Sequence, residues 1–207
     1  MDLEFEVVLA SASPRRRELL AQAGVPFTVH ATDVDETLEP DLAANPSEAV
    51  KKLAERKAHA AVEEILNSGY AGALIVLGSD TMVALGNDVF GKPVDADQAT
   101  SMLQALSGRT HQVHTAVSLW MIHAPADGDI SLGYRTFVDT THVTFRDLDA
   151  GEIASYVATG DPFDKAGAYG IQSGAGVFVD HIDGSLDTVI GLPVERLLRE
   201  FPDIPRV

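Results

Sequence analysis

The chain has 207 residues, of which 45% are hydrophobic and 22% charged, a composition typical of a folded globular protein. Its formal net charge of −16 disfavours general nucleic-acid binding, because most of the surface repels polyanions, and no apolar run reaches the roughly 18 residues of a membrane span. Cysteine is absent, which excludes disulfides and thiolate chemistry. We therefore expect a single cytoplasmic domain over residues 1–207, with no signal peptide, no transit peptide and no membrane or nucleic-acid partner.

The first twenty residues predict a strand, a tight turn and the start of a helix. Residues 7–10 form an apolar run typical of a buried strand, and three small residues, 11–13, follow it. Ser13 suits the N-cap, and Pro14 suits the first helical position, where a missing N–H costs nothing. The N-terminus of this helix would offer free N–H groups and a partial positive charge to an anion.

Three arginines lie in the first turn of this helix. Arginine matches phosphate oxygens with a rigid two-pronged donor, so the turn is a candidate phosphate site. Arg15 and Arg16 lie one turn before the apolar pair Leu19 and Leu20, which places them on the inward face, whereas Arg17 points to another side. The alternative is an ordinary exposed basic turn, but positive charge here opposes the helix dipole unless an anion is nearby.

Residues 27–30 alternate weakly and predict a short strand, and an acidic run, 33–36, follows them. Composition alone favours a solvated acidic loop for this run. The alternative is that Asp35 or Glu36 faces a cleft and offers hard oxygen ligands to a divalent cation.

The longest predicted helix begins at Pro46, with Asn45 as its cap, and ends near Ser68. Lys57 lies on or beside its apolar stripe. A lysine in that place usually extends outward to water, but if its ammonium group ends in a cleft, it becomes a phosphate-binding candidate.

A second apolar run, 74–77, predicts a strand buried on both faces, and it leads to Asp80. Ligand sites of open α/β sheets lie beyond the carboxyl ends of strands, so Asp80 is the best candidate for a catalytic carboxylate, although a turn-forming aspartate is the alternative. A hairpin turn is expected at 86–88, and Lys92 follows it.

The second half of the chain continues the alternation of helices and strands. The five histidines at positions 111, 114, 123, 142 and 181 show no metal-ligand spacing, and we expect them on strand surfaces. A glycine-rich stretch, 160–172, would let backbone approach a ligand closely. The expected elements are a helix over 96–106 with a capping box at Asp95, paired antiparallel strands over 111–122 and 134–145, a helix from Asp149 to 159, a strand over 177–182 and a last helix over 188–201.

Five stretches spread over nearly the whole chain resemble, in order, the motifs of the Maf family of nucleotide pyrophosphatases. They are Leu9-Ala10-Ser11-Ala12-Ser13-Pro14-Arg15-Arg16, Gly78-Ser79-Asp80-Thr81, Gly91-Lys92-Pro93, Ser107-Gly108-Arg109-Thr110-His111 and Asp164-Lys165-Ala166-Gly167-Ala168-Tyr169-Gly170-Ile171-Gln172. The resemblance implies an α/β fold with an elongated, mixed, twisted sheet, flanking helices and two lobes around a central cleft, similar to the inosine triphosphate pyrophosphatases.

The resemblance also implies roles for particular residues. Asp80 matches the family's catalytic acidic residue, and Glu36 matches a second acidic residue that helps to hold a divalent metal, Mg²⁺ or Mn²⁺. Arg15, Thr81 and Gln172 match positions that separate the substrate subgroups, and the last motif resembles the dTTP/UTP subgroup. The polar and basic cleft positions of the family correspond to Ser11, Ser13, Arg15, Arg16, Lys57, Lys92 and Lys165.

The implied reaction is hydrolysis of a nucleoside triphosphate to the monophosphate and pyrophosphate. Two carboxylates and a divalent cation can hold and acidify a water, and the basic residues can take the charge that develops on the leaving pyrophosphate. Two alternatives stay open at this point: a phosphatase that removes only the γ-phosphate, and a nucleotide-binding regulatory protein of cell division with little turnover. The resemblance is also compatible with a homodimer.

Overall fold

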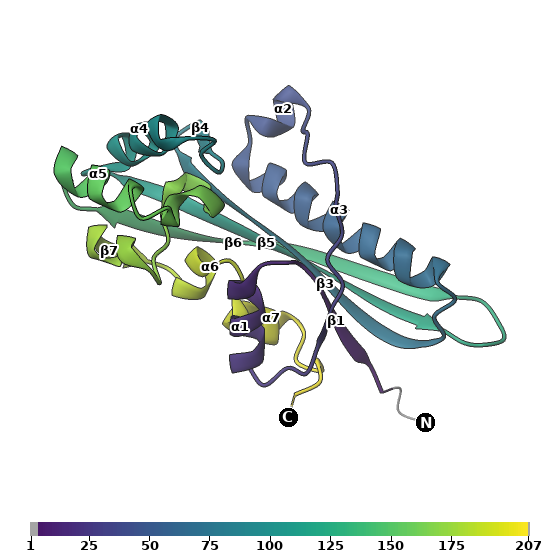
Figure 1. Ribbon diagram of the computed structural model, residues 1–207. Helices are drawn as coiled ribbons and strands as arrows, with labels where there is room; N and C mark the ends of the chain where they lie inside the picture. The colour runs from purple at the N-terminus through teal and green to yellow at the C-terminus, as the bar shows by residue number, and fades with distance from the viewer. Residues whose placement is uncertain (1–3, 207) are drawn as a thin grey trace.

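Three long strands form the centre of the molecule, which the computed structural model describes over residues 4–206 (Figure 1). They are β3 (Gly72–Leu85), β5 (Thr110–Ala124) and β6 (Ser131–Phe145), and they pair antiparallel along almost their whole length. The sheet has seven strands in the order β2-β1-β3-β5-β6-β7, with β4 paired to β3 beside this path. The shorter strands are β1 (Glu6–Ala10), β2 (Thr28–Val29), β4 (Asp88–Phe90) and β7 (Val179–Asp183).

One edge of β3 is shared by two different strands, with a gap between them. β1 runs parallel to β3 and its last pair joins Ala10 to Gly78, whereas β4 runs antiparallel and its pairs begin at Val83. Among the described residues, therefore, positions 79–82 of β3 have no strand partner on this edge. The carboxyl end of β1 lies at this gap, which is where open α/β sheets place their ligands.

Helices cover both faces of the sheet and one of its ends (Figure 1). The long helix α3 lies along one face, while α1, α6 and α7 lie on the other. Two helices and three short 3₁₀ turns gather at the end of the sheet that also carries β7. The bounds are α1 (Pro14–Gln22), α2 (Pro40–Ala43), α3 (Pro46–Asn67), α4 (Ala96–Leu106), α5 (Ala150–Val157), α6 (Leu186–Ile190) and α7 (Val194–Glu200), with the 3₁₀ turns at Asp161–Asp164, Ala166–Ala168 and Gly174–Phe178.

Local sequence signals explain most helix starts. Asn45 caps α3 by accepting from the backbone N–H of Glu48, and Asp149 with Glu152 forms a complete capping box at the start of α5. The box expected at Asp95 is only half formed, because the Gln98 side chain accepts from the N–H of Val94 instead.

The hydrophobic core is divided into two lobes that share the long strands. One cluster packs α4, α5 and the glycine-rich segment around the fully buried Phe145. Two others pack α1 and α7 on one face of the sheet, around Leu20, and α3 on the other face, around Val62. The fold class expected from the resemblance, a mixed twisted α/β sheet with flanking helices and two lobes, is confirmed.

The structure differs from the predicted elements in four places. β3 continues past residue 77 to Leu85, so Asp80 lies inside a strand rather than after one. The last helix is broken into α6 and α7 at Gly191, whose φ of 127° favours glycine. β7 begins at Val179 rather than at 177, and the short helix α2 was not predicted. No helix in the described part of the chain is long and apolar enough to cross a membrane.

Candidate active site

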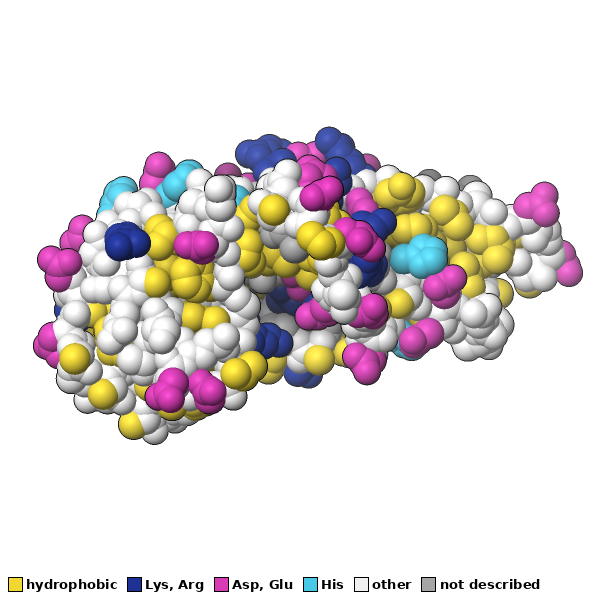
Figure 2. All heavy atoms as spheres, turned by 90° about the horizontal axis from the view of Figure 1, so that it is seen from above, with side chains coloured by type: hydrophobic (Ala, Val, Ile, Leu, Met, Phe, Trp, Pro, Cys, Tyr) yellow, Lys and Arg dark blue, Asp and Glu magenta, His cyan; other side chains and the backbone are white. Residues whose placement is uncertain are grey.

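A cavity of about 830 Å³ opens at the gap in the sheet, between the two lobes. Figure 2 shows this hollow near the middle of the molecule, with lysine and arginine side chains around it. Every residue that the resemblance assigns to the site contributes to its lining, whereas Asp35, the alternative to Glu36, does not. The assigned residues are Ser11, Ser13, Arg15, Arg16, Glu36, Lys57, Asp80, Thr81, Lys92, Lys165 and Gln172.

Lys57 lies between two carboxylates at the centre of the cavity. Its Nζ is 2.6 Å from Oδ1 of Asp80 and 2.7 Å from Oε1 of Glu36. The side chains of Lys57 and Asp80 are only 16% and 12% exposed, while that of Glu36 is 59% exposed. The hydrogen bond from Lys57 holds the pKa of Glu36 below its usual range.

Gly78 allows α3 to approach β3 closely enough for this contact. A Cβ at position 78 would lie 2.5 Å from the carbonyl oxygen of Ala54 and 2.6 Å from the amide nitrogen of Ala58. Both atoms belong to the backbone of α3, on either side of Lys57, so the missing side chain sets the distance between helix and strand.

The two carboxylates fit a hard divalent cation. No group of three or more His, Cys, Asp or Glu residues in the part of the chain described here could hold a metal by itself. Glu36 and Asp80 nevertheless converge on one cation, the ammonium of Lys57. Mg²⁺ commonly takes only one or two protein carboxylates and completes its shell with water and substrate phosphates. The predicted ligand pair Glu36 and Asp80 is therefore suited to Mg²⁺ or Mn²⁺.

The arginines at the start of α1 divide their contacts as the helical phase predicts. Arg16 reaches inward: its Nε donates to the carbonyl of Gly191 at 2.8 Å, and its two terminal nitrogens donate to Ser11 Oγ and Thr81 Oγ1 at 3.2 and 3.1 Å. Burial lowers the pKa of Arg16, which the charge of Asp80 opposes. Arg17 is exposed and donates to the carbonyl of Ala12.

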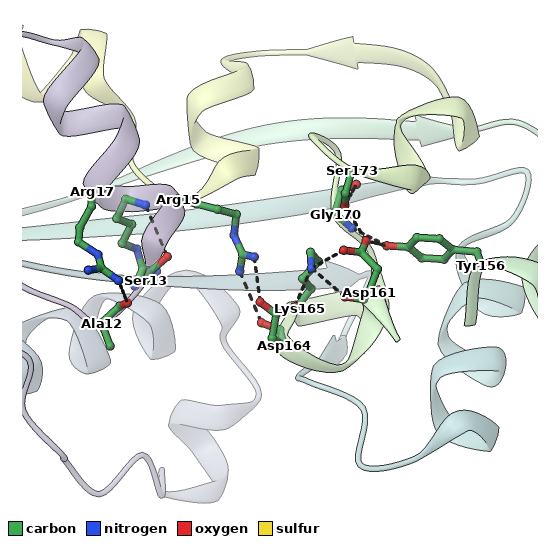
Figure 3. Close-up of polar contacts among 11 residues, drawn as sticks. Ala12, Ser13, Arg15, Arg17, Tyr156, Asp161, Asp164, Lys165, Gly170 and Ser173 are labelled. Atoms are coloured by element: carbon green, nitrogen blue, oxygen red, sulfur yellow. Dashed lines mark hydrogen bonds and ion pairs between the residues drawn. The ribbon is translucent and has the colours of Figure 1, made fainter. Parts of the chain in front are cut away.

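Arg15 connects the two lobes across the cavity. Its Nη1 lies 3.0 Å from Oδ2 of Asp164, which belongs to the segment after α5 (Figure 3). The other carboxylate oxygen of Asp164 accepts from Nζ of Lys165 at 2.6 Å. A single carboxylate is thus paired with cations from both lobes.

Asp161 organises the glycine-rich segment around Lys165 (Figure 3). One of its carboxylate oxygens accepts from the hydroxyls of Tyr156 and Ser173, both at 2.5 Å, and the other accepts from Lys165 at 2.9 Å. Burial favours the neutral acid, but these hydrogen bonds outweigh it and hold the pKa of Asp161 below its usual range. The Tyr156 hydroxyl also accepts from the N–H of Gly170, which fixes the backbone of the segment.

The remaining predicted residues lie at the rim of the cavity or stabilise the turn at residues 11–13 that precedes α1. Lys92 and Gln172 are exposed on the rim of the cavity, and no hydrogen bond within residues 4–206 engages the Gln172 amide. Ser13 caps α1, accepting from the N–H of Arg16 at 3.5 Å, and Ser11 Oγ accepts from the N–H of Ser13.

Four residues near the site differ from what the sequence predicts. The prediction of surface histidines is wrong for His111 and His114, which are buried on β5; His111 is hydrogen-bonded to the Tyr169 hydroxyl at 2.8 Å. Tyr156 and Asp161 were not recognised as site residues, because a tyrosine on a helix face and an aspartate before proline are typical of core and turn positions.

A cleft at a gap beside one strand of an α/β sheet, lined by cations and by two converging carboxylates, is typical of a protein that binds a polyanion together with a divalent metal. The chain belongs to the family described as Maf-like protein, which it matches over residues 6–204, and this confirms the resemblance drawn from the motifs.

Two relatives found by sequence agree with this membership. A dTTP/UTP pyrophosphatase of Bacillus thuringiensis subsp. konkukian is 45% identical over 196 residues, which cover 95% of this chain and 94% of the relative. A protein of the same description from Bacillus anthracis is 44% identical over the same shares. Among solved structures, a HAM1 protein from Coxiella burnetii is 15% identical with a TM-score of 0.43, covering 97% of this chain and all of the other.

Proposed function

We propose that this protein hydrolyses dTTP and UTP to the nucleoside monophosphate and pyrophosphate. The observation that carries the proposal is the pairing of Lys57 with Glu36 and Asp80 inside a cleft otherwise rich in cations. A protein that only bound a polyanion would gain nothing from carboxylates in its cleft, whereas hydrolysis needs groups that orient water. The relatives described as dTTP/UTP pyrophosphatases supply the substrate class.

The basic residues are assigned to the triphosphate. Arg15 and Lys165 are already paired with Asp164, so their donors converge on an anion in the cleft before any nucleotide arrives. Three polar groups already occupy Arg16, so we assign it to shaping the turn at residues 11–13 and neutralising nearby phosphate charge. These cations stabilise the charge that develops on the leaving pyrophosphate.

The acidic residues are assigned to the attacking water. A bound Mg²⁺ or Mn²⁺, held by Glu36 and Asp80, would supply Lewis-acid polarisation of the phosphate oxygens. Asp80 orients the water for in-line attack on the α-phosphorus, and its carboxylate accepts the hydrogen bond from that water. Lys57 keeps the two carboxylates together until the substrate enters.

Product analysis on a nucleotide panel tests this function. We expect dTTP and UTP to give pyrophosphate as the primary product, with the activity abolished by excess chelator. Orthophosphate as the primary product would identify a γ-phosphatase instead. Stoichiometric nucleotide binding without turnover would identify a regulatory binder, and either result would refute the proposal.

We also infer that the protein acts in the cytoplasm on free nucleotides. A net charge of −16 and the absence of cysteine support this placement. Cell fractionation with an antibody against the chain tests the location, and light scattering on the purified protein tests whether it forms a homodimer.

A further inference from the structure

The segment that carries Glu36 is less buried than the strands and helices that line the rest of the cleft. Residues 31–39 connect β2 to α2 with neither helix nor strand, and all of them are exposed or only half-buried. A segment without buried apolar contacts opens easily unless polar contacts hold it. The place of Glu36 in the cavity therefore depends on hydrogen bonds and ion pairs to its neighbour α3.

Arg56 of α3 makes the contacts that flank Glu36 directly. Its Nη1 donates to the carbonyl oxygens of Asp35 at 3.0 Å and of Thr37 at 2.7 Å, one on each side of Glu36. The Asp35 carboxylate folds back and accepts from the N–H of Thr37 at 2.9 Å, which makes a tight turn and turns both carbonyls toward α3. The next residue of the helix, Lys57, holds the Glu36 carboxylate itself.

Two other polar contacts attach the beginning of the segment, and the packing of α2 against α3 adjoins its other end. His30 pairs with Glu64 at 2.7 Å, and the Thr32 hydroxyl lies 3.5 Å from the carbonyl of Lys57, a long hydrogen bond. Neither contact constrains the backbone on the far side of Glu36. The Arg56 guanidinium spans both sides, and it does not contribute to the lining of the cavity formed by residues 4–206.

We propose that Arg56 is a positioning residue for the pyrophosphatase reaction, acting through the backbone of Glu36. The expected effect of Arg56 on activity rests on the proposed function, whereas its stabilisation of segment 31–39 does not. The guanidinium would fix where the Glu36 carboxylate enters the cavity, so the effect of Arg56 on turnover would pass through Glu36.

Hydrogen exchange measured by mass spectrometry tests the structural half of this proposal. In the full-length protein without ligands, we expect Arg56→Ala to raise the exchange rate of peptides covering 31–39 by about tenfold and to leave the long strands unchanged. The matched control is Lys52→Ala, an exposed cation one turn earlier on α3. Unchanged exchange in 31–39, or an increase spread over the whole chain, would overturn the proposal.

A double-mutant cycle tests the functional half. Arg56→Ala should lower kcat/KM for dTTP by about tenfold in the wild-type background but less than about twofold in the Glu36→Gln background. Arg56→Lys, which keeps the charge and some donors, should recover part of the loss. Equal losses in the two backgrounds would show that Arg56 does not act through Glu36. If the wild-type protein hydrolyses no nucleotide, the proposed function fails, and the exchange result alone decides the role of Arg56.

Discussion

At the scale of single residues, the charge of Asp80 can be separated from its shape. Asp80→Asn keeps an oxygen that can accept from Lys57 but removes the negative charge that binds a cation and orients water. We expect turnover of dTTP to fall by at least ~100-fold with the fold intact. Steady-state kinetics with a thermal melt measure both, and Asp88→Asn at the exposed start of β4 is the control. Normal turnover in a folded Asp80→Asn protein would remove Asp80 from the reaction.

Gln172 is the residue that we expect to read the base. Its amide, free of protein hydrogen bonds among the described residues and on the cavity rim, can accept from N3–H of uracil or thymine and donate to a neighbouring carbonyl. Cytosine mismatches this pair, and a polar group left unsatisfied beneath the bound base, which would cover the amide, costs about 1–3 kcal/mol, or roughly 5- to 150-fold. Gln172→Ala should reduce the ratio of kcat/KM for UTP over CTP. Gln104→Ala, at an exposed position on α4, should not. An unchanged ratio in Gln172→Ala would mean that another residue selects the base.

His111 should make the stability of the fold depend on pH. Burial lowers its pKa to about 4, so the unfolded chain, with an ordinary pKa near 6.5, takes up a proton first as the pH falls. The contribution of neutral, buried His111 to the free energy of unfolding is therefore fully present above about pH 6.5. It is lost progressively as the pH falls toward 4, by about 3 kcal/mol in total.

Urea denaturation across this pH range measures the effect. His111→Gln can keep a hydrogen bond to the Tyr169 hydroxyl, and we expect it to reduce the dependence of the free energy of unfolding on pH. The exposed variant His181→Gln should leave that dependence as in the wild type. A slope that survives His111→Gln would place the pH sensitivity in other groups.

At the scale of elements, the contact between α3 and β3 sets the geometry of the site. Gly78→Ala would force the helix backbone away from the strand, at a cost of about 1–3 kcal/mol in the free energy of unfolding. It would also move Lys57 relative to Asp80, so we expect turnover to fall together with stability. Gly133→Ala, at a strand glycine with open space around it, is the control for both measurements. Wild-type stability and turnover in Gly78→Ala would show that the helix tolerates the shift.

Elements that depend on local signals could be predicted, and those that depend on distant contacts could not. The caps at Asn45 and Asp149 and the apolar runs of β1 and α3 act over a few residues, so they located the helices and strands closely. The motifs also located the lining of the cavity. The gap beside residues 79–82 is different, because it arises from where β1 ends and β4 begins, which only the folded sheet defines.

The same reasoning explains which contacts of the site were not foreseen. The phase of α3 placed Lys57 beside the apolar stripe but could not show that an exposed loop folds onto it and brings Glu36 within 2.7 Å. The hydrogen bonds of Tyr156 and Asp161 also join segments whose proximity no periodic pattern encodes.

At the scale of the whole molecule, Asp164 pairs with cations of both lobes, and we expect it to compete with a phosphate ligand for them. Asp164→Asn should free Arg15 and Lys165 for a phosphate ligand and tighten the binding of pyrophosphate several-fold, with little change in stability because the Asp164 carboxylate is largely exposed. Calorimetric titration with pyrophosphate measures this, and Asp180→Asn on β7 is the control. Weaker binding by Asp164→Asn would mean that the carboxylate orients the cations rather than competing with the ligand.

The long strands also determine how the molecule can move. β3, β5 and β6 pass without a break through both lobes, so no linker separates them and the lobes share backbone hydrogen bonds. Relative motion of the lobes must then be a torsion of one continuous sheet, in which each strand resists over its full length, rather than a rotation about a hinge. We expect such a torsion to move the lobes less than a hinge would, so that selection among nucleotides would depend on fit to the cleft more than on closure of the lobes around the bound molecule.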